Sequence, residues 1–262
     1  MARAPVKLQD NRFEPTVERA TARGRVVLVC EHASNHIPAA WGDLGLRDDQ
    51  RRAHIAWDPG ALAVSRGLAE QLDAVLVHAP VSRLVYDLNR APDMAGSMPT
   101  RSEVHDIPGN AAITPEERLR RTQAIYLPWV HGLHGVIQGR IALGLAPVIV
   151  TIHSFTPIYF GKPRAVEFGV IHDDDPTLAQ AILDQARAQT QLVAELNAPY
   201  SAKDDVTHTL RVQATPYGLP NAMLEIRNDL IADQAAQEAM AQMLAPVINM
   251  GVEEIQRQAK AS

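Results

Sequence analysis

An uninterrupted apolar run at residues 26–30, Val-Val-Leu-Val-Cys, constrains the fold more than any other feature of the sequence. A short run rich in β-branched residues predicts a strand buried on both faces, typical of the centre of an α/β sheet. The next six residues, 31–36, include Glu31, His32, Asn35 and His36. Ligands bind beyond the carboxyl ends of the strands in open α/β sheets, so this polar segment is a candidate site.

Alternation of apolar runs and helical periodicity predicts the rest of the fold. Strands are expected at residues 73–79, 147–154, 165–172 and 221–227, and helices at 58–72, 114–143 with a break at Pro128, 176–197 and 229–259. Strands that alternate with helices of this length indicate an α/β fold with a mostly parallel or mixed sheet. Residues 1–24 lack periodicity and are expected to be an N-terminal arm, with residues 25–262 forming a single domain.

Composition excludes several classes of function. A net charge of -5 gives no electrostatic footprint for nucleic acid or anionic lipid, so we expect no nucleic-acid partner. No apolar run reaches the length of a transmembrane helix, and residues 1–17 lack the apolar segment of a secretory signal. The single cysteine, Cys30, cannot form an internal disulfide and is expected to be a small core residue. We therefore expect a cytoplasmic protein with no membrane partner.

Two further strands end on residues that suit metal-dependent chemistry. The run at 147–152 ends on His153, as the first run ends beside His32, and the strand at 221–227 contains Glu225. Catalytic zinc sites use histidine nitrogens and carboxylate oxygens, with three protein ligands and one open position. His32 and His153 are the candidate ligands, and Glu225 is the candidate carboxylate that takes and returns a proton.

The third ligand and the anion-binding residues are less determined by this pattern. Glu31, Asn35 and Asp58 are all candidates for the third ligand. An anionic substrate requires a positive group, which Arg90 or Arg83 would supply through forked hydrogen bonds.

Structural interpretations remain open for the same residues. Asp58 precedes Pro59 and Gly60, a sequence typical of a helix start, so its role is equally well explained as a helix cap. Glu225 and Arg227 lie two positions apart, on one face of a strand, and can form a structural ion pair.

Five segments resemble the N-formylglutamate amidohydrolase family, and together they span residues 26–230. They are residues 30–38 (CEHASNHIP), 56–61 (AWDPGA), 82–90 (SRLVYDLNR), 152–154 (IHS) and 225–227 (EIR). The Asn-Arg pair, the His-Ser at a strand end and the Glu-Ile-Arg also resemble, more distantly, the zinc carboxypeptidases. The resemblance implies a three-layer α/β/α sandwich around a mixed, mostly parallel sheet. It also implies a zinc-type hydrolase of linear amide bonds.

The resemblance implies roles for individual residues. His32 and His153 correspond to metal ligands, and Glu225 corresponds to the base that activates the attacking water. Asn89 and Arg90 correspond to the pair that holds a substrate carboxylate, with Arg83 as a second anion contact.

One position departs from the carboxypeptidase pattern. Carboxypeptidases carry His-x-x-Glu, whereas this chain has Asn35, whose neutral oxygen is a poor zinc ligand. Asp58 is therefore expected as the third ligand, with Glu31 as the next candidate. Zn²⁺ is the expected cofactor, and two histidines with one short carboxylate also suit other divalent ions.

The expected reaction is metal-dependent hydrolysis of N-formyl-L-glutamate, a small anionic N-acyl amino acid, to formate and L-glutamate, which by resemblance belongs to histidine degradation. One alternative is a metallohydrolase of another N-acyl amino acid or a short peptide, with the long loop at residues 91–109 setting the choice. The other is a metal-free binding protein on the same fold, which Asn35 favours.

Overall fold

The computed structural model describes residues 12–261, and within them a seven-stranded sheet runs in the order β1-β3-β2-β6-β11-β9-β10. β1 pairs antiparallel with β3 and β9 pairs antiparallel with β11, whereas the other neighbours are parallel. The sheet is therefore mixed and mostly parallel, as the sequence predicted. Its strands are β1 (Thr16–Glu18), β2 (Val26–Cys30), β3 (Val75–His78), β6 (Val148–Phe155), β9 (Phe168–Ile171), β10 (Ala194–Leu196) and β11 (Asn221–Arg227).

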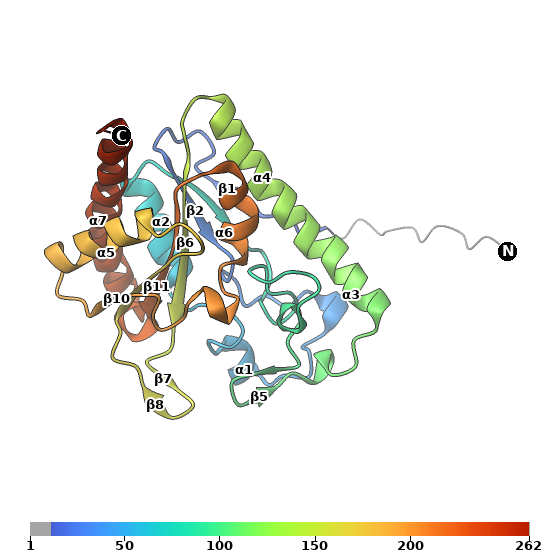
Figure 1. Ribbon diagram of the computed structural model, residues 1–262. Coiled ribbons are helices and arrows are strands. Elements are labelled where there is room, and N and C mark those ends of the chain that lie inside the picture. Colours follow the sequence, from blue (N-terminus) through green and yellow to red (C-terminus); the bar gives the residue numbers. More distant parts are fainter. Residues whose placement is uncertain (1–11, 262) are drawn as a thin grey trace.

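Helices cover both faces of this sheet (Figure 1). One face packs against α2 (Ala61–Gln71), α5 (Thr177–Gln189) and α7 (Gln234–Ala261). The other packs against α4 (Leu127–Ala142) and α6 (His208–Gln213), with α3 (Pro115–Arg121) continuing along α4 and α1 (Asp48–Arg52) at the periphery. Two small hairpins complete the fold: β4 (Arg101–Ser102) with β5 (His105–Asp106), and β7 (Ile158–Tyr159) with β8 (Lys162–Pro163). The three-layer sandwich is confirmed.

Alternation along β2 explains the continuous apolar run. Val26, Leu28 and Cys30 face the core under α2, α5 and α7, whereas Val27 and Val29 face the core under α4 and α6. Because both faces are covered by helices, every residue of the strand is apolar and at most 4% exposed. Cys30 is a buried core residue, as predicted.

The helix expected at residues 114–143 is interrupted close to Pro128. Thr114 caps α3 by accepting a hydrogen bond from the Glu117 amide, and a π-helical turn at Thr122–Tyr126 separates α3 from α4. Proline has no N–H to bond the carbonyl four residues earlier, that of Ala124. The amide of Phe13 donates to this carbonyl instead, at 2.8 Å, which ties the N-terminal segment to the break.

Two expectations about local structure were wrong. Residues 16–18, part of the expected surface arm, form edge strand β1, because their backbone pairs with β3; residues 1–11 lie outside the described part. The helix expected to reach residue 197 ends at Gln189, where Thr190 turns to an extended conformation. Residues 194–196 then pair with β9 as edge strand β10, so hydrogen bonding to the sheet overrides local helical periodicity.

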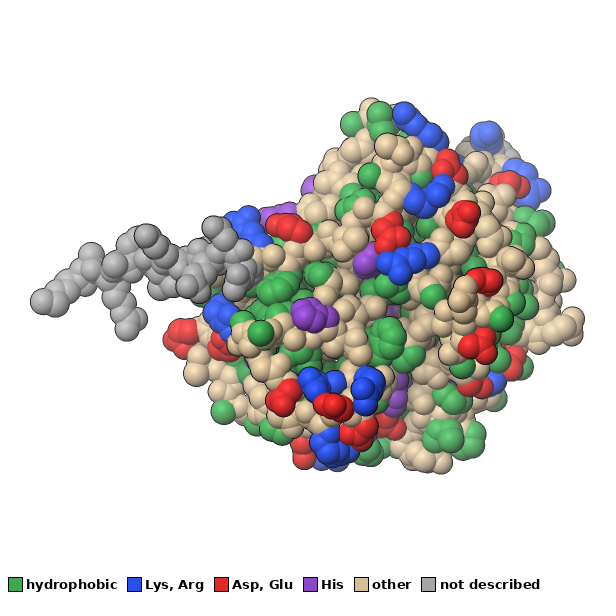
Figure 2. Space-filling view, turned by 180° about the vertical axis from the view of Figure 1, so that it is seen from behind, with side chains coloured by type: hydrophobic (Ala, Val, Ile, Leu, Met, Phe, Trp, Pro, Cys, Tyr) green, Lys and Arg blue, Asp and Glu red, His purple; other side chains and the backbone are tan. Residues whose placement is uncertain are grey.

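The outer surface carries both signs of charge. On the face seen in Figure 2, lysine and arginine side chains are interspersed with aspartate and glutamate side chains. Among residues 12–261, no helix has the length and apolar character needed to cross a membrane.

Gly169 on β9 allows a loop to close over the sheet beside Glu225. A Cβ atom at this position would overlap the carbonyl oxygen of Ala198, in the loop that leads to Tyr200. We expect Gly169→Ala to lower the free energy of unfolding by about 1–3 kcal/mol, measured by denaturant titration. Gly135→Ala is the control, because Gly135 lies exposed in α4 with open space around its Cβ position and alanine favours helices. Equal stability of the two variants would contradict this packing argument.

Candidate active site

The carboxyl ends of β2, β6 and β11 bring three polar side chains side by side. Sheet register pairs Glu225 with His153, and pairs Val29 with Thr151, so Glu31 follows β2 in line with His153. Strand alternation directs these side chains to the face covered by α4 and α6. Each of the three is at most 4% exposed. The strand ends therefore form a buried polar row, and the position of these residues at strand ends agrees with the sequence prediction.

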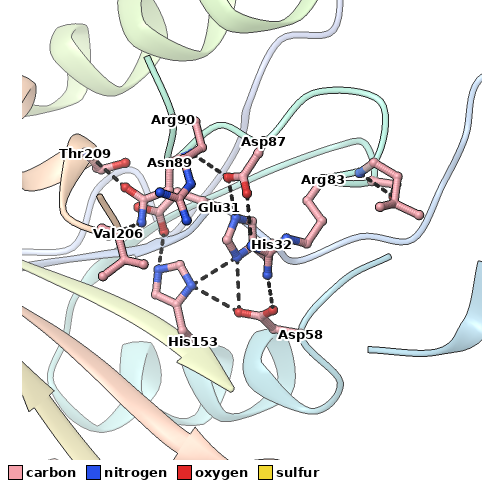
Figure 3. A network of polar contacts seen from close by, with 12 residues as sticks. Glu31, His32, Asp58, Arg83, Asp87, Asn89, Arg90, His153, Val206 and Thr209 are labelled. Carbon is pink, nitrogen blue, oxygen red and sulfur yellow. Dashed lines mark hydrogen bonds and ion pairs between the residues drawn. The ribbon is translucent and has the colours of Figure 1, made fainter. Parts of the chain in front are cut away.

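His32, Asp58 and His153 converge on one point (Figure 3). The Nδ1 atoms of the two histidines lie 3.2 Å apart, and Asp58 Oδ2 lies 3.3 Å from His32 Nδ1 and 3.0 Å from His153 Nδ1. Tetrahedral zinc with bonds of about 2.0–2.1 Å separates its ligand atoms by about 3.3 Å. The three buried atoms thus have nearly the spacing that a divalent cation requires, and this group fits one.

The remaining ring nitrogens each contact a carboxylate. His32 Nε2 lies 2.8 Å from Asp87 Oδ1, and His153 Nε2 lies 3.2 Å from Glu31 Oε2. The Asp87 contact is a hydrogen bond and favours the His32 tautomer with its proton on Nε2, which leaves Nδ1 free to bind a metal. The Glu31 contact is an ion-pair distance without a hydrogen bond, and it places negative charge beside His153 Nε2. Carboxylate–histidine pairs of this kind are a general feature of metal sites in proteins.

The charge balance of the cluster favours a bound cation. Burial alone would raise the pKa of Asp58, but His32 and His153 hold that pKa far below its usual range. Burial would lower the pKa of His153, but the charge of Glu31 and the hydrogen bond to Asp58 raise it well above the usual range. The carboxylates are thus ionised at neutral pH and attract either protons or a metal to the imidazoles, so metal binding would release protons.

Arg83 is held by the carboxylates of this cluster. Its guanidinium donates from Nη1 to Asp58 Oδ1 at 3.2 Å and from Nη2 to Asp87 Oδ2 at 2.9 Å. Arg83 therefore fixes the orientation of both carboxylates. Its role as a substrate contact stays a prediction. The two ion pairs already use both terminal nitrogens of the guanidinium, Nη1 and Nη2.

Asn89 and Arg90 are fixed by backbone groups of residues 204–209. The side-chain Nδ2 of Asn89 donates to the Val206 carbonyl, and its Oδ1 accepts from the backbone amide of Thr209 at 2.9 Å. Arg90 Nη1 donates to the Asp204 carbonyl at 2.7 Å. Both side chains line the same cavity as the cluster, and their role in binding a substrate carboxylate stays a prediction.

Glu225 lines this cavity with an unsatisfied carboxylate. Its Oε2 is buried and has no hydrogen-bond partner among residues 12–261. Burial, opposed by His153 and reinforced by the charge of Asp58, raises the pKa of Glu225 to about 7. A carboxyl with this pKa exchanges a proton readily near neutral pH. It forms no ion pair with Arg227, which instead pairs with Glu167 and Asp229.

Among the candidates for a third ligand, Asp58 is the one that joins the two histidines. Asn35 donates to the Arg51 carbonyl instead, and Glu31 lies behind His153, at the ring nitrogen that faces away from the cluster. The helix-cap interpretation of the Asp58 side chain was wrong, because α2 begins at Ala61 with Gly60 as its cap residue. Only the Asp58 carbonyl oxygen serves the helix start, accepting from the Ala61 amide at 3.2 Å.

The cluster opens into a cavity of about 470 Å³. Ser102 and Glu103, from the long loop after Arg90, form part of its wall. Asp87, Arg164 and Tyr200 also line this cavity, and no role was predicted for them. Asp87 carried a usable signal, because it lies four residues after Arg83 and two before Asn89, whereas the other two lie in loops without a recognisable pattern.

The fold and site together define an α/β enzyme with a buried histidine–carboxylate group at the carboxyl edge of its sheet. The model of the N-formylglutamate amidohydrolase family matches residues 24–232, so this chain belongs to that family and is a hydrolase of amide C–N bonds.

Two solved structures are similar over nearly the whole chain. Gene product Atu2144 from Agrobacterium tumefaciens is 48% identical with a TM-score of 0.91, over 94% of this chain and 97% of that chain. N-formylglutamate amidohydrolase from Ralstonia eutropha JMP134 is 18% identical with a TM-score of 0.67, over 94% of this chain and 99% of that one. At such low identity the second similarity supports the fold alone. No curated protein matches this chain significantly.

Proposed function

We propose that this protein hydrolyses N-formyl-L-glutamate to formate and L-glutamate in a metal-dependent reaction. The observation that carries the proposal is the buried His32–Asp58–His153 triangle in a chain of this family. Beside it lies Glu225, whose Oε2 has no hydrogen-bond partner among residues 12–261. The substrate class is a small anionic N-acyl amino acid. In a cell the reaction would belong to histidine degradation in the cytoplasm.

His32, Asp58 and His153 would hold the divalent cation, with Zn²⁺ as our first candidate. When bound there, such an ion polarises a carbonyl and lowers the pKa of water. Asp87 and Glu31 keep the two imidazoles oriented, and Arg83 keeps Asp58 and Asp87 oriented. With these partners the site would need little rearrangement to bind an ion.

Glu225 carries the proton in the proposed reaction. It takes a proton from the attacking water as the oxygen bonds to the formyl carbon, and it then delivers that proton to the departing nitrogen as the C–N bond breaks. Its pKa of about 7 suits both transfers near neutral pH. The water supplies the new oxygen of formate, and the amine leaves as L-glutamate.

Arg90 would bind one carboxylate of the substrate, and Asn89 would position Arg90. The two backbone contacts of Asn89 fix the turn that carries Arg90, so Asn89 acts by holding this turn against residues 206–209. A fixed guanidinium can bind a carboxylate through two hydrogen bonds, which orients the formyl group toward the cluster.

The test is release of formate from N-formyl-L-glutamate by the purified protein. We expect turnover that a strong chelator abolishes and that Zn²⁺ or another divalent ion restores, with N-formyl-L-leucine as a comparison substrate. Absence of formate release from protein shown by elemental analysis to contain metal would overturn the proposal. Undiminished turnover after complete metal removal would overturn its metal dependence.

A further inference from the structure

Three arginines line the cavity within the described residues, and they differ in what they contact. Arg83 is paired with two carboxylates of the cluster. Arg90 and Arg164 form no ion pair with any carboxylate of residues 12–261 and are therefore available to an anion. Arg90 Nη1 is anchored on a backbone carbonyl, as described above. Arg164 is the second cation without a carboxylate partner.

Arg164 is held in place by aromatic rings. It follows the β7–β8 hairpin, which extends from the end of β6, the strand that carries His153. Its guanidinium carbon lies 4.3 Å from the centre of the Tyr159 ring, 4.8 Å from that of Tyr200 and 5.4 Å from that of Phe155. Stacking on ring faces restricts a guanidinium while leaving the N–H groups at its edge free for a planar anion.

One donor of Arg164 lacks a partner. Its Nη1 is buried and makes no hydrogen bond with any described residue. A buried donor without a partner costs free energy, so a bound anion that accepts from Nη1 would be stabilised. The arrangement thus resembles a prepared anion site rather than a structural ion pair.

Arg164, Tyr200 and Glu225 line the same cavity, and the Arg164 guanidinium lies against the Tyr200 ring. Burial and then the charge of Glu225 raise the pKa of Tyr200 to about 12, whereas the charge of Arg164 opposes this rise. This direction agrees with the shared cavity, which Tyr200 lines together with both charged groups. An anion on Arg164 would share the cavity with a group that reacts at Glu225.

N-formyl-L-glutamate carries two carboxylates besides its amide, and each requires a partner if it is to leave water. Arg90 supplies one positive group, and Arg83 is already paired. We propose that Arg164 binds the side-chain carboxylate of the substrate and so selects acidic over neutral N-acyl amino acids. This inference rests on the proposed function and extends it to a specificity-determining residue.

The test compares two substrates of nearly equal shape, N-formyl-L-glutamate and N-formyl-L-glutamine. We expect Arg164→Met to reduce the preference in kcat/KM for the acidic substrate by about 10–100-fold, as expected for a lost hydrogen-bonded charge pair. Methionine retains an unbranched side chain that can pack between the rings. Lys162→Met removes the same charge from an exposed position on the same hairpin and should leave the preference within about twofold.

Two kinetic outcomes would overturn the inference. One is an equal loss of activity on both substrates in Arg164→Met, which would indicate a structural effect. The other is an Arg164→Met variant that still prefers N-formyl-L-glutamate over N-formyl-L-glutamine but no longer prefers it over the α-amide, N-formyl-isoglutamine. In that case Arg164 would bind the α-carboxylate and would not select the side chain.

A binding measurement separates this inference from the proposed reaction. Calorimetric titration of N-formyl-L-glutamate into Glu225→Gln and into the double variant with Arg164→Met requires no turnover. Tighter binding to the single variant by about 10–100-fold would support the role of Arg164 even if the wild-type protein failed to hydrolyse this substrate. Turnover with equal affinities would overturn the role of Arg164 and leave the proposed function standing.

Discussion

Replacing Glu225 by glutamine is expected to lower kcat on N-formyl-L-glutamate by about 10²–10⁴-fold, with KM changed by no more than a few-fold. Glutamine keeps the size of the side chain but cannot accept and return a proton. Glu225 lines the cavity beside the cluster, and its Oε2 has no other partner among the described residues. Steady-state formate release by metal-loaded protein measures this effect.

A fold control accompanies this prediction. Folding raises the pKa of Glu225 from its ordinary value of 4.5 to about 7, so between these pH values the folded protein binds more protons than the unfolded chain. Stability from this group therefore falls as pH rises through this window. Metal-stripped Glu225→Gln should therefore melt at pH 8 no lower than wild type. Glu195→Gln, on the exposed side of β10, should keep full activity. A Glu225→Gln variant within tenfold of wild-type kcat would exclude Glu225 as the base.

Removing Asp58 or His153 is expected to abolish stoichiometric metal binding and activity together. The ligand atoms of His32, Asp58 and His153 form a triangle with edges of 3.0–3.3 Å, so loss of one leaves only two ligands. Removal of a residue that only orients a metal ligand weakens metal binding by about 10–100-fold. We expect Asp58→Ala and His153→Ala to weaken it more than that. Elemental analysis and competition with a chelator measure the change.

Two further variants test the assignment of the third ligand. Asn35→Ala should keep its metal, because its amide donates to the Arg51 carbonyl and stays outside the cluster. Glu31→Gln should weaken binding by about 10–100-fold, as expected for a residue that orients His153. Metal retained by Asp58→Ala but lost from Asn35→Ala or Glu31→Ala would transfer the ligand role to that residue.

Local patterns in the sequence predicted the positions of the central strands. β11 spans the predicted residues 221–227, and β2 and β6 lie within one residue of their predicted bounds. Edge strands β1 and β10 were missed, because a three-residue strand has too little periodicity to distinguish it from a loop or a helix end. Their backbone pairing with β3 and β9 decided their structure.

Some residues of the candidate site were likewise predictable from local sequence patterns, and others were not. The sequence by itself determined that Glu31, His32, His153 and Glu225 would lie at strand ends, because strand periodicity and the end of an apolar run are local properties. The tertiary structure decided that Asp58 would join the two histidines, that Asp87 would support His32 and that Arg164 would face the same cavity. These three residues lie on connecting segments between or after strands, and a connection has no periodicity that reports its direction. Their positions depend on how distant parts of the chain pack against one another.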